Sequence, residues 1–135
     1  MKLKRKIFLL IPIAVIAAYI IYTWSVILFI NHWATWRHYI GLILFIALIY
    51  LLIRSFKQAA VATGIYLIIG TLNLLTITSN VLLAWGFRIG SLEISLPIFQ
   101  PRLFLIFLIY IFLNFDTLVD IRLDYIEAKE LRKRK

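Results

Sequence analysis

Carboxylates near the C-terminus form the most regular set of polar side chains in the sequence. On a helix, with about 100° between successive residues, five of them fall within an arc of about 120°. Basic side chains collect on another side of the same helix. Such a face is either an acidic surface in water or a docking surface for a partner. The residues of this predicted docking face are Asp116, Asp120, Asp124, Glu127 and Glu130.

Asp116 is the acid nearest to the predicted membrane interior. It precedes the end of an apolar run, between Asn114 and Thr117. An ionisable group at the membrane edge belongs either to a proton path or to a structural ion pair. Lys57 or Arg54 is predicted to lie at a similar depth, and we therefore expect an ion pair.

The third apolar run carries most of the polar groups expected inside the membrane. On a helix they fall within an arc of about 140°, which must face protein or a wet cavity because lipid does not solvate an amide. They either bond to neighbouring helices or line the path of a polar solute. The residues of this predicted seam are Thr63, Gly70, Asn73, Thr76 and Asn80.

Histidines and aromatic residues gather in the first loop, at His32, Trp33, Trp36, Arg37, His38 and Tyr39. They would suit a metal, a haem or a quinone, or a belt of aromatic rings at the membrane surface. We expect the aromatic belt, because the histidines point about 120° apart on a helix and no carboxylate lies near them in sequence. The absence of cysteine excludes thiolate chemistry and disulfides. We expect no cofactor and no metal.

Composition identifies the elements that position these groups. The 135 residues are 64% hydrophobic and have a mean hydropathy of +0.98, which a soluble domain of this size could not bury. The sequence predicts an all-α protein with four transmembrane helices in a compact bundle, forming a single polytopic membrane domain over 1–135. The predicted spans are 7–30, 38–53, 59–85 and 103–120, and the fourth continues as a charged helical tail over 121–135.

The distribution of lysine and arginine predicts the orientation. If the N-terminus is cytoplasmic, twelve of the 15 basic residues lie inside and three lie outside, so both termini are expected in the cytoplasm. The net charge of +9 gathers at the chain ends, which favours anionic lipid headgroups over nucleic acid as partner. The predicted headgroup contacts are Lys2, Lys4, Arg5, Lys6, Arg132, Lys133, Arg134 and Lys135. We expect a multi-pass protein of the bacterial cytoplasmic membrane.

The second outer loop, 88–102, alternates apolar and polar residues from Ser91 to Ile98, which is typical of an extended chain. A lone strand would leave its backbone unpaired. We therefore expect this segment to pair with another copy of the chain or with a partner.

These observations favour a small non-enzymatic protein. No nucleophile with a base, no paired catalytic carboxylates and no Gly-rich phosphate loop stand out in the sequence. We expect an anchoring, assembly or regulatory subunit of a membrane complex, acting through its charged helix as a homo-oligomer or with a membrane-protein partner. The alternative is a small oligomeric channel or transporter lined by the seam of the third span.

Overall fold

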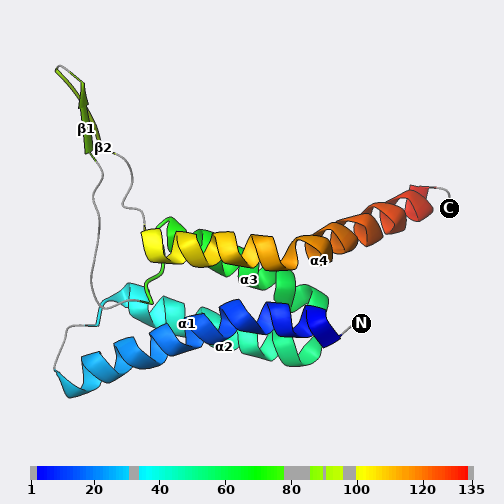
Figure 1. The fold of residues 1–135 in the computed structure, drawn as a ribbon, viewed down its shortest axis with the longest axis horizontal. Coiled ribbons are helices and arrows are strands. Elements are labelled where there is room, and N and C mark those ends of the chain that lie inside the picture. The colour runs from blue at the N-terminus through cyan, green and yellow to red at the C-terminus, as the bar shows by residue number, and fades with distance from the viewer. Residues whose placement is uncertain (1–2, 31–33, 78–85, 90, 96–99, 134–135) are drawn as a thin grey trace.

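The computed structural model describes residues 3–30, 34–77, 86–89, 91–95 and 100–133. These residues form six elements, in the order α1 (Leu3–Phe29), α2 (Trp36–Arg54), α3 (Phe56–Thr71), β1 (Gly86–Ile89), β2 (Leu92–Ser95) and α4 (Pro101–Lys133). The helices form a bundle, and both chain ends lie at one end of it (Figure 1). We call the end of the bundle at which α1 begins and α4 leaves the bundle the charged end. The opposite end, where α2 and α4 begin, is the loop end.

The predicted helical bundle is confirmed, and three of its helices are long and apolar enough to cross a membrane: α1, α2 and α4. Large apolar side chains on α2, such as Ile43 and Ile46, are exposed on the outside of the bundle. That is the arrangement a lipid environment favours and water does not. The 33-residue helix α4 begins at Pro101, whose missing N–H costs nothing in a first helical turn.

Helix α3 ends at Thr71, so the helix expected over 59–85 is wrong over 72–77, and residues 78–85 lie outside the described residues. Asn73 has φ 60°, and asparagine tolerates this left-handed conformation better than most residues. The Asn73 N–H donates to the Gly70 carbonyl at 3.0 Å, and the Leu74 N–H donates to the Ile69 carbonyl at 3.1 Å. These two bonds form a Schellman motif, which terminates the helix. The 16 residues of α3 span about 24 Å, against about 30 Å of hydrocarbon.

The irregular segment 72–77 then packs across the loop end of the bundle. The Thr23 hydroxyl donates to the Ile77 carbonyl at 2.6 Å, so α1 holds the far end of the segment. Gly41 of α2 allows the close approach, because a Cβ at that position would lie 2.8 Å from the backbone oxygen of Thr76. Non-helical backbone near a membrane needs such burial and bonding within protein.

The core of the bundle is centred on α3, which packs against α2 on one side and α4 on the other, while α1 packs mainly against α4. The Tyr110 ring lies against Gly64, where a Cβ would be 3.2 Å from the ring. Its hydroxyl donates to the Ala60 carbonyl. The largest fully buried apolar side chains come from all four helices and segment 72–77: Leu9, Ile16, Leu48, Leu67, Leu75, Ile77, Leu103 and Tyr110.

Within the alternating segment of the second outer loop, Leu92–Ser95 is extended, as predicted, but its partner is within the chain. Strands β1 and β2 pair antiparallel, with Gly86 opposite Ser95 and Arg88 opposite Glu93. The pairing expected with another copy of the chain is thus replaced, along one edge of each strand, by pairing within the chain. The hairpin stands away from the helices at the loop end (Figure 1).

Candidate functional site

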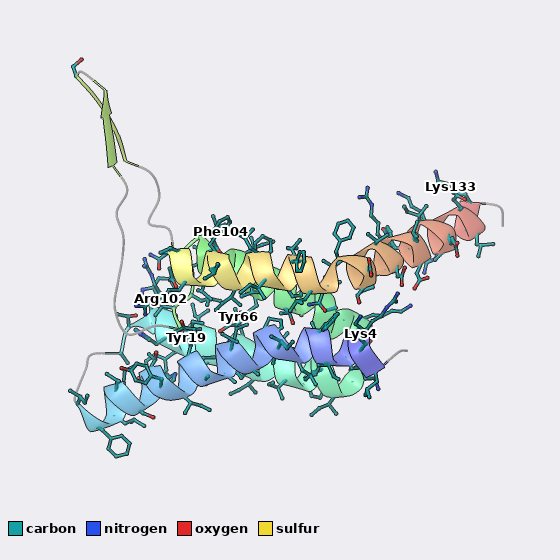
Figure 2. The ribbon with its side chains drawn as sticks, in the orientation of Figure 1. Lys4, Tyr19, Tyr66, Arg102, Phe104 and Lys133 are labelled. Carbon is teal, nitrogen blue, oxygen red and sulfur yellow. The ribbon has the colours of Figure 1, made fainter. Side chains whose placement is uncertain are left out.

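The charged end brings together three parts of the chain that the sequence separates widely. The first turns of α1, the connection at Ser55 between α2 and α3, and the part of α4 that leaves the bundle all lie here. Figure 2 shows Lys4 at this end, and the side chains of α4 projecting from its last turns up to Lys133. The opposing charges of this region therefore meet in space.

Two ion pairs connect α4 to the other helices at this end. Arg5 of α1 pairs with Asp120, and Lys57 of α3 pairs with Asp124. All four side chains are more than one third exposed, so each pair adds at most about 1 kcal/mol to stability. Their effect is positional, because they fix α4 relative to two different helices at the point where it leaves the bundle.

The ion pairs divide the predicted docking face. Asp120 and Asp124 are already paired with Arg5 and Lys57, and these four side chains line a cavity of about 400 Å³. Leu123 and Glu127 also contribute to the lining of the same cavity. Asp116, Glu127 and Glu130 are exposed, and none of them forms an ion pair within the described part of the chain. Within the predicted docking face, these three acids are therefore free to pair with a partner.

The expected partner of Asp116 is wrong. Lys57 pairs instead with Asp124, which lies eight residues further along α4, or about 12 Å. The lysine on the first turn of α3 therefore reaches beyond the apolar part of α4. Asp116 is exposed on the outside of the bundle, and neither of the two ion pairs formed by described residues involves Arg54.

The free part of α4 carries leucines that the sequence analysis did not include in the docking face. Every residue from Arg122 to Lys133 is exposed, over about 18 Å of helix. Leu123 and Leu131 are 53% and 64% exposed and lie at helical spacing around Glu127 and Glu130. These four residues fall within an arc of about 100°. We call them the tail face: Leu123, Glu127, Glu130 and Leu131.

The predicted headgroup contacts lie at this end where the structure describes them. Lys4 lies over the ring of Phe8, with its Nζ 5.5 Å from the ring centre. Lys6, Arg132 and Lys133 are exposed, whereas Arg5 is held by Asp120 and is a poorer headgroup ligand than expected. Lys2, Arg134 and Lys135 lie outside the described residues.

The predicted seam of the third span is not one helical face, because α3 ends at Thr71. The Thr63 hydroxyl donates to the Ala59 carbonyl of its own helix at 2.8 Å. Gly70 is in close contact with Leu103, since a Cβ there would lie 2.6 Å from the leucine side chain. Asn80 lies outside the described residues. Asn73 and Thr76 belong to a different cluster at the loop end.

That cluster is organised by Gln100, a residue that sequence reasoning missed. Its Nε2 lies 2.6 Å from Asn73 Oδ1, 3.0 Å from the Leu75 carbonyl oxygen and 3.0 Å from Thr76 Oγ1, and its two N–H groups are shared among these three acceptors. Gln100 is 4% exposed and Asn73 is 5% exposed. The Gln100 backbone N–H also donates to the Thr71 carbonyl. This residue therefore ties the start of α4 to the end of α3 and to segment 72–77.

The described aromatic residues of the first loop make contacts and hydrogen bonds at the start of α2. His38 Nδ1 bonds with the backbone N–H and the hydroxyl of Thr35, which caps the helix. Trp24 and Tyr39 form an edge-to-face pair, with their ring centres 5.3 Å apart. Arg37 lies over the Trp36 ring at 5.4 Å. His32 and Trp33 lie outside the described residues.

No protein family, curated protein or solved structure matches this chain.

Proposed function

We propose that the chain is a non-enzymatic subunit of a membrane complex, which it anchors, assembles or regulates by binding a partner at the tail face. The observation that carries this proposal is an exposed, mixed face of leucine and glutamate on a helix whose base is held by two ion pairs. Exposed leucines beside unpaired carboxylates suit a partner surface with an apolar centre and basic rim. A face of α4 that was only exposed to water would not need these leucines.

In this proposal the charged end faces the cytoplasm of a bacterial cell and all four helices cross its cytoplasmic membrane. The excess of basic residues at the charged end supports this orientation. Helix α3 is short, and segment 72–77 completes its crossing inside the protein, bonded to α1 and to Gln100. Both termini are then cytoplasmic, and the tail face meets cytoplasmic partners or the inner parts of membrane-protein partners, including further copies of the chain.

The alternative of a channel along the third span has less support. A pore needs polar groups that are free to replace the hydration of a solute. Thr63, Asn73 and Thr76 instead use their side chains in bonds within the protein. The seam residues that the structure describes therefore serve packing better than transport.

The sidedness of the tail is the first requirement of the proposal, and a reporter fusion measures it. A reporter that is active only in the cytoplasm, joined after Lys135, should be fully active, because the positive residues hold that end inside. A reporter that is active only outside the cell should be inactive at the same position. Activity of the external reporter alone would overturn the orientation and the proposed docking of cytoplasmic partners.

A further inference from the structure

A second cavity at the charged end, separate from the tail face, has the features of a lipid site. It measures about 320 Å³ and lies where α1, the end of α2 and the start of α3 meet. Its lining is Lys6, Leu10, Leu52, Ile53, Arg54, Ser55 and Phe56. One part of this lining is cationic and the other is apolar, so the cavity suits an amphiphile.

The charges of this cavity are not neutralised by the protein. Its lining contains two cations and no carboxylate. Lys6 and Arg54 are exposed, and neither forms an ion pair with another described residue, whereas the neighbouring Arg5 and Lys57 are both paired with acids of α4. Carboxylates of α4 thus neutralise Arg5 and Lys57, whereas Lys6 and Arg54 have no carboxylate partner among the described residues.

The backbone adds donors at the same place. Ser55 is the N-cap of α3, and its side chain makes no capping hydrogen bond. The first amides of α3 therefore receive no hydrogen bond from the Ser55 side chain. Helix amides point toward the N-terminus of their helix, and at this N-terminus Ser55 and Phe56 line the cavity. A helix start of this kind favours an anion, and here it adds to the two cations.

The apolar wall decides between a lipid and a free anion. Ile53 is 83% exposed and Leu10 is 46% exposed on the outside of the bundle. Both lie beside the cations in the lining of one cavity. A free phosphate ion gains nothing from such side chains, whereas the acyl chains of a phospholipid cover them and remove them from water.

We infer that this cavity binds an anionic phospholipid of the same leaflet. Lys6, Arg54 and the first amides of α3 hold its phosphate, and Leu10, Leu52 and Ile53 contact its acyl chains. The inference rests on the proposed insertion in the membrane and does not depend on the tail face. A lipid held here lies between α1 and the α2–α3 connection, so it joins two parts of the bundle at the charged end.

A lipid titration of the full-length protein tests this inference. Thermal unfolding is followed in neutral detergent micelles with added phosphatidylglycerol, phosphatidylcholine or inorganic phosphate, since a ligand of the folded state raises the melting temperature. Phosphatidylglycerol should stabilise the protein, and the other two should not. The double variant Lys6→Gln/Arg54→Gln should bind phosphatidylglycerol about 25-fold more weakly, at about fivefold for each charge.

The matched control removes two positive charges from the basic side of α4, as Arg122→Gln/Lys129→Gln, at exposed positions that are not among the predicted headgroup contacts. Its affinity for phosphatidylglycerol should stay within about twofold of the original protein. An equal loss in both double variants would overturn the site in favour of a general surface potential. Equal stabilisation by inorganic phosphate would overturn the lipid as occupant, and equal stabilisation by phosphatidylcholine would overturn the role of the cations. None of these results bears on partner binding at the tail face.

Discussion

Replacement of Gln100 by leucine is expected to lower the free energy of unfolding by about 2–3 kcal/mol. The two N–H groups of the Gln100 amide are shared among acceptors of Asn73, Leu75 and Thr76, and a leucine side chain donates to none of them. A buried acceptor left without a donor costs about 1–3 kcal/mol in water-soluble proteins, and interhelical bonds in membranes average somewhat less. Unfolding in mixed detergent micelles of increasing denaturing strength measures the difference.

The matched control is Gln58→Leu, the same substitution at an exposed position in the first turn of α3. It should change the free energy of unfolding by less than about 0.5 kcal/mol, as surface substitutions do. If the two variants unfold alike, the cluster around Gln100 does not hold segment 72–77 in place. The Gln100→Leu variant should still insert in the membrane, because the long apolar helices are unchanged.

Neutralising the unpaired acids of the tail face should reduce recovery of the partner at least tenfold. In Glu127→Gln/Glu130→Gln both carboxylates of the tail face are lost, while the ion pairs at the base of the tail stay intact. A tenfold loss corresponds to about 1.4 kcal/mol. Reversal to lysine at both positions should be worse, because like charges across an interface repel. Quantitative co-purification in mild detergent measures the recovery.

Two controls separate docking from a general effect of charge. Arg122→Gln/Lys129→Gln changes the basic side of the same helix and should leave recovery near that of the original protein. Asp120→Asn/Asp124→Asn should reduce recovery only about two- to threefold, since those carboxylates are paired with Arg5 and Lys57. Full recovery with both glutamates neutralised would remove the proposed docking surface.

The long helices could be predicted because their apolar runs are uninterrupted and their ends carry clear markers. Pro101 begins α4, and no glycine or proline interrupts the passage from its apolar part into the charged tail. The end of α3 could not be read from hydropathy, because the apolar run continues past it. The sequence carries one indication of this helix end, Asn73, because asparagine adopts the left-handed conformation more readily than most residues. No glycine or proline follows closely on its C-terminal side to mark the end more clearly.

Long-range contacts were less accessible to sequence reasoning. The alternation from Ser91 to Ile98 predicted an extended chain, but β1 was missed because Gly86 and Phe87 adjoin the apolar run assigned to the third span. Gln100 was missed because a single amide before a helix carries no periodicity. The pairing of Lys57 with Asp124 depends on how α3 and α4 pack, which depth in the membrane alone does not determine.

The most direct measurement of the central claim is site-specific photocrosslinking in living cells. A photoreactive residue at position 130, within the tail face, is compared with one at Tyr50, an exposed position on the outside of α2. The proposed function predicts a discrete protein adduct from position 130, lost in the presence of Glu127→Lys, and none from position 50. Absence of any protein adduct from position 130, in cells where the chain is correctly inserted, would contradict it.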